Sequence, residues 1–216
     1  MTRRKTGVLI SGRGSNLKCL IEACAAPDYP AEIVLVVSNR ANAAGLDHAR
    51  AAGIAHVVVP HRDYADRESF DAAVTGALER AGVEIVCLAG FMRLLSDAFV
   101  TRWHDRLLNI HPSLLPAFKG THAHRDALAA GVRFSGCTVH FVRLEMDSGP
   151  IIVQAAVPVA PDDTEATLGA RVLAAEHRAY PLALRLVASG RARTVGARVE
   201  IDGAAAPSGY ALNPAE

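Results

Sequence analysis

The chain has 216 residues, half of them hydrophobic, and its 23 Lys and Arg nearly balance 22 Asp and Glu. This length and composition fit one good-sized domain with a substantial core, and the near-neutral charge argues against a bulk nucleic-acid or membrane-surface binder. The four cysteines include no C-x-x-C pair, which favours a reducing compartment. No signal peptide or membrane span is evident, so we expect a cytoplasmic protein without nucleic-acid or membrane partners.

Short β-branched runs alternate with Ala-rich stretches along the first half of the chain. Buried strands are predicted at 6–11, 32–38, 55–60, 84–90 and 107–111, and helices at 15–26, 41–53 and 66–82. Strand–helix–strand repeats form right-handed crossovers, which place the strands parallel and cover both faces of the sheet. The pattern predicts an α/β fold with a doubly wound, mostly parallel sheet and helices on both faces.

After residue 132 the pattern changes. Longer strands are predicted at 133–143 and 149–159, a long helix at 163–189 and a short strand at 197–203. The last residues, about 204–216, are small and polar enough to form a loosely ordered tail. With no repeat and no Pro/Ser-rich linker, we expect a single domain, 1–216, with two functional halves.

A glycine-rich stretch, "SGRGSNL", follows the first predicted strand and opens the first helix. Gly14 permits a tight turn, and Ser15 and Asn16 are good N-cap residues. A helix N-terminus of this kind binds anions, phosphate above all. Leu17 stands where the dinucleotide fingerprint requires a small residue, and no acidic residue ends the second strand, so a single phosphate is favoured over NAD. A plain connecting turn is an equally good interpretation of the loop alone.

"LLNIHPSLLP" places Asn109 and His111 two residues apart at the end of a predicted strand, so their side chains share one face. Ligands of doubly wound sheets bind at this end of the strands. A histidine moves protons near pH 7, and an amide stabilises a developing oxyanion. The alternative is a histidine satisfied within the core. The carboxylates that are candidates to orient His111 are Asp126, Glu145 and Asp147, of which Asp147 is favoured because a Ser-Gly-Pro turn follows it.

Two further stretches carry weaker signals. "GFMRLLS", residues 90–96, either forms an apolar slot for a flat ring or is core at the start of a helix. His122 and His124 form an H-x-H pair without an obvious partner carboxylate, so we expect no metal there. No Ser or Cys sits in a nucleophile elbow.

Taken together, the motifs resemble a known family. "SGRGSNL", "LAGFMRLLS", "NIHPSLLPAFKGTHAHRDAL", "GCTVHFV" and "MDSGPIIVQAAVPV", in this order, closely resemble the folate-dependent formyltransferases, and "SGRGSNL" points to the branch that acts on glycinamide ribonucleotide. The resemblance runs from about residue 6 to the "EHRAYPLAL" helix. It implies a Rossmann-like formyltransferase fold. It also implies formyl transfer from 10-formyltetrahydrofolate to the amine of glycinamide ribonucleotide, giving formylglycinamide ribonucleotide and tetrahydrofolate in de novo purine biosynthesis, without a metal.

The resemblance also assigns residues to roles. The implied catalytic residues are Asn109, His111 and Asp147. The half at about 1–105 would bind the ribonucleotide and the half at about 106–195 would carry folate and catalysis. The ribonucleotide contacts would be Gly14, Ser15, Asn16 and Glu176. The folate contacts would be Arg67, Met92, Arg93, Leu94, Leu95, Asn109, Arg143, Leu144, Glu145, Met146 and Asp147. Arg13 and Leu173 stand at positions where relatives often carry other residues.

The chemistry of these residue types agrees with the implied reaction. Attack of the amine on the formyl carbon produces an oxyanion that Asn109 and His111 can stabilise, and His111 with Asp147 can move the proton to the leaving folate nitrogen. Rival interpretations are methionyl-tRNA formyltransferase, expected to carry a further C-terminal domain, and formyltetrahydrofolate hydrolase, expected to carry an added N-terminal one. A third is a non-catalytic module that binds a phosphate ligand. Monomer and homodimer remain equally open.

Overall fold

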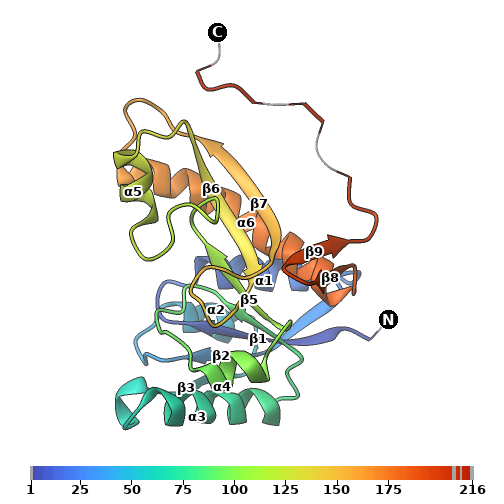
Figure 1. Cartoon of the computed structure of the whole chain (residues 1–216). Helices are drawn as coiled ribbons and strands as arrows, with labels where there is room; N and C mark the ends of the chain where they lie inside the picture. Colours follow the sequence, from blue (N-terminus) through green and yellow to red (C-terminus); the bar gives the residue numbers. More distant parts are fainter. Residues whose placement is uncertain (1, 206–207, 210, 215–216) are drawn as a thin grey trace. The chain divides into compact units, whose positions relative to one another are not determined.

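The computed structural model describes residues 2–205, 208–209 and 211–214 (Figure 1). By its contacts the chain divides into two compact units: Met1–Asn109 with Phe141–Leu144, and Ile110–His140 with Glu145–Glu216. The single-domain interpretation therefore stays a prediction. Within the described part, no helix is long and apolar enough to span a bilayer.

The first unit is built on parallel strands. They are β1 (Arg4–Ile10), β2 (Ala31–Ser38), β3 (His56–Val58), β4 (Ile85–Leu88) and β5 (Leu107–His111), the last of which continues into the second unit. Strand β1 pairs in parallel with β2 and β4, β2 pairs with β3, and β4 pairs with β5. All five predicted strands are present, within a few residues of their predicted bounds.

Helices cover both faces of this parallel sheet. They are α1 (Ser15–Cys24), α2 (Gly45–Ala51), α3 (Arg67–Arg80) and α4 (Asp97–Arg102), with a short 3-10 turn, η1 (His61–Asp63), before α3. Figure 1 shows α1 and α2 on one side of the strands and α3 and α4 on the other. Leu9 of β1 belongs to the core cluster formed with Phe70 and Leu78 of α3 and Trp103 after α4. Because side chains alternate along a strand, the buried neighbour Val8 faces the opposite side. The predicted helices on both faces are confirmed.

The second unit contains an antiparallel strand pair and a long helix. Its elements are α5 (Ala123–Ala129), β6 (Phe134–Phe141), β7 (Ile151–Pro158), α6 (Glu165–Ala188), β8 (Ala192–Val195) and β9 (Arg198–Ile201). Helix α6 packs against β7 and α5, and β8 pairs with β9 in a separate hairpin. The strand order β3-β2-β1-β4-β5-β6-β7, with β6 and β7 antiparallel, confirms the predicted mostly parallel sheet.

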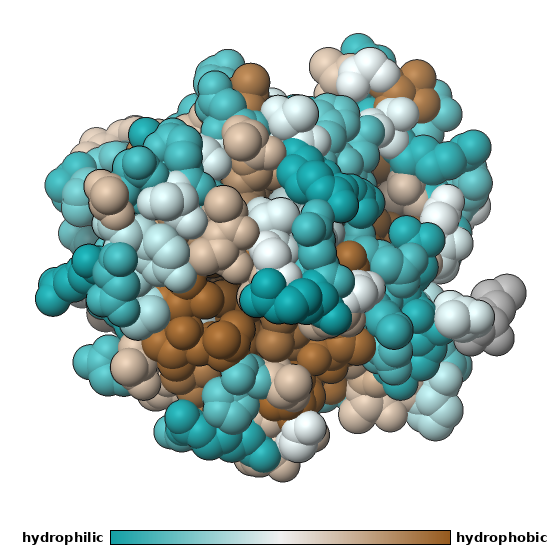
Figure 2. Space-filling view, turned by 90° about the horizontal axis from the view of Figure 1, so that it is seen from below, coloured by the Kyte–Doolittle hydropathy of each residue, from teal (hydrophilic) through white to brown (hydrophobic). Residues whose placement is uncertain are grey.

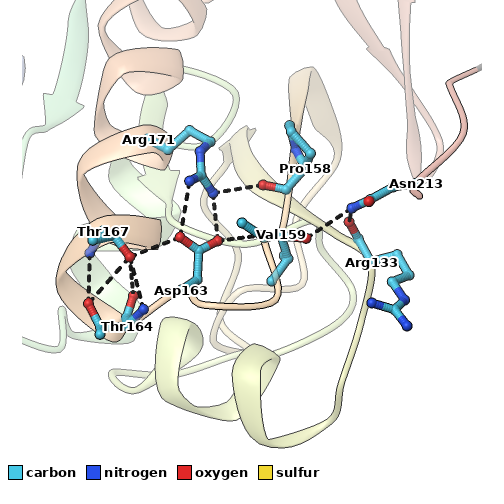
Figure 3. A network of polar contacts seen from close by, with 9 residues as sticks. Arg133, Pro158, Val159, Asp163, Thr164, Thr167, Arg171 and Asn213 are labelled. Atoms are coloured by element: carbon cyan, nitrogen blue, oxygen red, sulfur yellow. Dashed lines mark hydrogen bonds and ion pairs between the residues drawn. The ribbon is translucent and has the colours of Figure 1, made fainter. Parts of the chain in front are cut away.

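A polar network joins the end of β7 to the start of α6 (Figure 3). Thr164 caps the helix by accepting the Thr167 N–H, while the Thr167 hydroxyl accepts the Thr164 N–H in return. Asp163 accepts two hydrogen bonds from the Arg171 guanidinium, at 2.7 and 3.0 Å, and one from the Ala160 N–H at 2.7 Å. Arg171 also donates to the carbonyl of Pro158, the last residue of β7. The network thereby fixes the first two turns of α6.

Part of the predicted loose tail is held by hydrogen bonds to the same unit. The Asn213 side-chain amide donates to the carbonyl oxygens of Val159, at 3.0 Å, and Arg133, which flank β7 and β6 (Figure 3). Residues 206–207, 210 and 215–216 of that tail lie outside the described residues. The loosely ordered tail stays a prediction, to which these two hydrogen bonds of the Asn213 amide add a point of attachment.

Strand β6 approaches β7 so closely that Gly136 leaves no room for a side chain. A Cβ at this position would lie 1.9 Å from the Ala155 carbonyl oxygen and 2.9 Å from a methyl of Leu114. The neighbouring atom is backbone and cannot move aside without breaking the ladder. Glycine is therefore required at position 136 because any side chain would collide with β7, and the backbone conformation does not impose this requirement.

We expect Gly136→Ala to destabilise the protein by ~3–5 kcal/mol, in the upper range for single substitutions, because it forces two paired strands apart. Chemical denaturation followed by circular dichroism measures the loss. Gly76→Ala in α3 is the matched control, since its Cβ meets only the end of the Arg80 side chain. That variant should gain ~0.5–1 kcal/mol from helix propensity. Equal stability of the two variants would contradict the close approach.

The Asp163 network predicts a dependence of stability on pH. Hydrogen bonds from the Arg171 guanidinium and the Ala160 N–H hold the pKa of the Asp163 carboxyl well below its usual range. A carboxyl whose pKa is lower in the folded state stabilises the fold above its unfolded-state pKa and loses that contribution as pH falls. Asp163→Asn should therefore lower the melting temperature at pH 7, and the difference from wild type should narrow below pH ~4. Asp162→Asn, at the exposed neighbouring position, is the control. A difference that stays constant with pH would refute this role.

Candidate functional site

The glycine loop after β1 has the geometry expected of an anion-binding helix start, with one correction. Gly14, at φ +73°, is the N-cap of α1, and its side-chain-free backbone turns the chain so that Ser15 is the first helical residue. The prediction of Ser15 or Asn16 as N-cap is thus wrong. A Cβ at Gly14 would lie 2.5 Å from Gly45 Cα, and the Gly45 N–H donates to the Gly12 carbonyl at 2.9 Å. The first N–H groups of α1 point out of the helix at this loop.

The segment 90–96 follows β4 as an exposed loop. The side chains of Met92 and Leu94 are largely exposed, at 66% and 64%, while Phe91 stacks its ring on Phe70 at 6.4 Å. The Met92 N–H donates to the Ser11 hydroxyl at 2.8 Å, which joins this segment to the end of β1. The sequence left two interpretations of this segment open, an apolar slot for a flat ring or core residues at the start of a helix. The second does not describe Met92 and Leu94, because both are exposed and helix α4 begins only at Asp97.

Apolar surface is also visible on the face seen from below. Figure 2 shows a connected brown patch on that face, bounded by teal polar side chains. Large exposed apolar patches in soluble proteins are commonly covered by a ligand or a partner. The exposed large apolar side chains include Met92 and Leu94 in the first unit and Met146 in the second.

His111 lies buried at the end of β5 between two oxygen atoms. Its Nε2 is 2.8 Å from the Phe118 carbonyl oxygen, and its Nδ1 is 3.4 Å from Asp147 Oδ2. The same Asp147 oxygen accepts the Gly120 N–H at 2.9 Å. A carbonyl oxygen accepts hydrogen bonds and cannot donate, so Nε2 carries a proton. The Nδ1 atom faces the Asp147 carboxylate at ion-pair distance.

The structure distinguishes the three carboxylates that the sequence left as partners for His111. Glu145 is exposed and forms an ion pair with Lys119 at 2.9 Å, and Asp126 pairs with its neighbour Arg125. The Asp147 side chain is 9% exposed and lies beside the imidazole. The favoured candidate, Asp147, is therefore the carboxylate that reaches His111.

The backbone around this pair is strained. Asp147 and Phe118 have φ of 52° and 53°, in the left-handed region that residues other than glycine rarely adopt. Such strain costs ~1–3 kcal/mol and persists where surrounding contacts fix it, commonly at functional sites. Here those contacts are the hydrogen bond that the Phe118 carbonyl accepts from His111 and the one that Asp147 accepts from the Gly120 N–H.

Two polar side chains of the antiparallel pair hold the segment that follows His111. Thr138 of β6 donates to the Ser113 carbonyl at 2.7 Å and accepts the Leu115 N–H at 3.0 Å. Gln154 of β7 donates to the Leu115 carbonyl at 2.9 Å and to Thr138. Buried backbone groups of a segment without regular secondary structure are satisfied in this way. These bonds fix Ser113 and Leu115, which precede Phe118 in the chain.

A cavity of ≈ 230 Å³ opens next to Asp147 in the second unit. Its lining residues are Leu115, Pro116, Lys119, Glu145, Asp147, Ser148, Gly149 and Ile151. The walls combine apolar side chains with one cation and two carboxylates. A ligand group that enters this cavity would meet the His111–Asp147 pair from the Asp147 side.

The remaining predicted residues of the second unit differ in burial. Glu176 is 7% exposed on α6, next to Cys137, and the thiol pKa there is raised to about 12 by burial first and by Glu176 second. Met146 is exposed, as a ligand contact would require. His124 is half-buried, and burial lowers its pKa. Among the described residues no three metal-ligating side chains come together, at His122 or elsewhere.

In the first unit the predicted contacts lie at different places. Asn109 is half-buried on β5, two residues before His111 and on the same strand face. Arg67, the first residue of α3, is exposed, and so is Leu144. Arg143 is engaged instead with Asp105 at 2.5 Å and with the Val142 carbonyl.

Sequence reasoning missed four residues, two beside His111 in the second unit and two that hold segment 90–96 in the first. Phe118 and Gly120 act through backbone atoms, which leave no signature in residue type. Ser11 and Asp71 act through side chains that accept the N–H groups of Met92 and Ser96. A signal existed for Asp71, because it falls on the apolar stripe of α3, where a carboxylate is out of place.

This chain belongs to the formyl transferase family, whose model matches residues 4–184. It is 45% identical to phosphoribosylglycinamide formyltransferase of Escherichia coli (strain K12), over 95% of this chain and 98% of that protein. Among solved structures it resembles glycinamide ribonucleotide transformylase 1 from Symbiobacterium toebii, with a TM-score of 0.90, 49% identity, and coverage of 92% of this chain and 94% of that one.

Longer proteins also contain a matching region. The trifunctional purine biosynthetic protein adenosine-3 of Gallus gallus is 58% identical over 86% of this chain, and the chain spans 18% of that protein's length. The human protein of the same name is 54% identical, and the chain spans 19% of it.

Proposed function

We propose that the chain transfers the formyl group of 10-formyltetrahydrofolate to the amine of glycinamide ribonucleotide, a step of de novo purine biosynthesis. The observation that carries this proposal is the buried His111–Asp147 pair at the end of β5, in a chain similar over nearly its whole length to phosphoribosylglycinamide formyltransferase of E. coli. The products are formylglycinamide ribonucleotide and tetrahydrofolate. We further propose a cytoplasmic protein, monomeric or homodimeric, with no nucleic-acid or membrane partner.

The proposed catalytic residues are Asn109, His111 and Asp147. The amine nitrogen attacks the formyl carbon, and the carbonyl electrons move to oxygen. Asn109 donates a hydrogen bond to that oxyanion, as does protonated His111. The tetrahedral intermediate collapses by breaking the bond to the folate nitrogen, which takes up a proton while the attacking amine loses one. Asp147 holds the charged imidazole, and His111 assists the proton transfer.

The proposed ribonucleotide site uses the start of α1 and one residue of α6. N–H groups of Gly14, Ser15 and Asn16 would bind the phosphate at the positive end of the helix. Buried Glu176 would accept hydrogen bonds from ribose hydroxyls, an interaction that offsets the cost of a buried carboxylate.

The proposed folate contacts combine exposed apolar side chains with backbone groups. The segment 92–95 would pack against the pterin and read its edge with N–H and C=O groups. Arg67 would pair with the carboxylates of the folate tail. The further proposed contacts are Asn109, Arg143, Leu144, Glu145, Met146 and Asp147.

Turnover by wild type and His111→Ala tests the proposed function. Release of tetrahydrofolate is followed by absorbance, with and without glycinamide ribonucleotide. We expect turnover that requires the ribonucleotide and falls by about 10²- to 10⁴-fold in the variant. His104→Ala is the matched control, because His104 also lies 3.4 Å from an aspartate, Asp105, but on the surface. Turnover without ribonucleotide would identify a hydrolase, and binding without turnover would identify a non-catalytic module.

The glycine loop yields a separate prediction. Gly14→Val combines a left-handed φ with a clash against Gly45, so it should distort the phosphate site and weaken ribonucleotide binding by at least tenfold. Binding of 10-formyltetrahydrofolate should change little. Calorimetry with each ligand measures both affinities. Gly53→Val is the control, since Gly53 has φ +66° with open space around it. An equal loss of both ligands would mean that the first turn has misfolded.

A further inference from the structure

The exposed segment between β4 and α4 is fixed at both ends by side chains that accept backbone N–H groups. At one end the Ser11 hydroxyl accepts the Met92 N–H at 2.8 Å. At the other end Asp71 Oδ2 accepts the Ser96 N–H at 2.5 Å. Between these points lie Met92 and Leu94, whose side chains are largely exposed. The segment has no helix or strand of its own to hold it.

Asp71 stands where the core of the first unit would accept an apolar residue. It is 2% exposed, and it lies on the buried face of α3 with Phe70, Val74 and Leu78. Burial of a carboxylate is costly unless hydrogen bonds compensate, and burial here raises the pKa of the Asp71 carboxyl. Among the described residues, its Oδ1 atom has no hydrogen-bond partner. The compensation comes from hydrogen bonding to Ser96 and, to a smaller extent, from the charge of Arg67.

Ser96 is the point at which the exposed segment becomes helix. Its hydroxyl accepts the Phe99 N–H at 3.3 Å and so caps α4. Its own N–H is buried and would be unsatisfied without Asp71, which costs ~1–3 kcal/mol for a backbone group. Asp71 therefore sets where the segment 92–95 ends. Arg67 lies one turn earlier on the same helix, so α3 carries both this carboxylate and a proposed contact to the folate tail.

We propose that Asp71, together with Ser11, is a positioning residue for the formyl donor: it holds segment 92–95 in the conformation that binds the folate ring. The proposal rests on the proposed function, because it assigns the donor to that segment. Asp71 acts through the Ser96 backbone and does not touch the ligand. When the bond between Asp71 and Ser96 is lost, a smaller fraction of molecules holds the segment in the binding conformation. The apparent affinity for the donor falls in proportion to that fraction.

Three variants test this role. Asp71→Ala removes the acceptor. Asp71→Asn keeps one acceptor oxygen for the Ser96 N–H and removes the charge. Val74→Ala, one turn along the same buried face, loosens the core without touching the segment. For each variant we would measure tetrahydrofolate binding by calorimetry, KM for 10-formyltetrahydrofolate, KM for glycinamide ribonucleotide, kcat and the melting temperature.

We expect Asp71→Ala to weaken tetrahydrofolate binding and raise KM for the donor by about tenfold, the equivalent of one hydrogen bond to a charged group. KM for the ribonucleotide and kcat at saturating donor should stay within about twofold of wild type. Asp71→Asn should restore most of the donor affinity. Val74→Ala should lower the melting temperature and leave donor affinity unchanged.

Other outcomes overturn the proposal. Unchanged donor affinity in Asp71→Ala means that the segment does not depend on this bond. Parallel losses in Asp71→Ala and Val74→Ala mean that Asp71 is a structural residue of the core. If wild type turns over but Asp71→Ala binds tetrahydrofolate equally well, the positioning role fails and the proposed function stands. If wild type neither binds folate nor turns over, both fail.

Discussion

Register between parallel strands is the constraint on which the site depends. Leu9 of β1 pairs with Leu88 of β4, and Leu88 pairs with Asn109 of β5, so the three strands reach one level together. In strands that are buried on both faces, polar side chains for a ligand or a reaction can lie only at the ends of the strands. The glycine loop and segment 90–96 both leave the sheet from this level, and β5 delivers Asn109 there before continuing to His111. A slip of one residue in any of these pairings would turn the alternating side chains of that strand to the wrong faces.

Polar groups around the site act on backbone more often than on one another. Thr138 and Gln154 bind the segment after His111, Asp147 binds Gly120, and Asp71 binds Ser96. Segments without regular structure leave N–H and C=O groups unpaired, and side chains on helices and strands supply their partners. Rigid elements thus determine the conformation of the segments that carry the proposed contacts. This explains why a strained residue such as Phe118 can persist beside His111.

The sequence predicted the repetitive parts of the fold and the residue types of the site. Periodicity located every strand of the parallel sheet and the helices α1, α2 and α3, but it did not predict the short helices α4 and α5, of six and seven residues. Motif spacing singled out His111, yet it left three carboxylates as partners, because the choice depends on how the chain returns after β6. The sequence favoured Ser15 or Asn16 as the N-cap of α1 because their side chains can cap a helix. The N-cap is Gly14 instead, where the close approach of Gly45 leaves no space for a side chain. The bonds to Phe118, Gly120 and Ser96 involve backbone atoms that any residue carries.

Gly14, the N-cap of α1, and Gly45, the first residue of α2, lie so close that a Cβ on either would crowd the other. A Cβ on Gly45 would approach Gly14 Cα at 3.0 Å, the Gly12 carbonyl at 3.2 Å and an Ile10 methyl at 2.8 Å. A side chain at one of these positions cannot be accommodated by a smaller residue at the other, because glycine is already the smallest residue there. Each glycine is therefore constrained by the backbone of the other loop, whatever residue stands elsewhere. Anyone who wishes to redesign this loop for a different anion has to rebuild the start of α2 together with the loop itself.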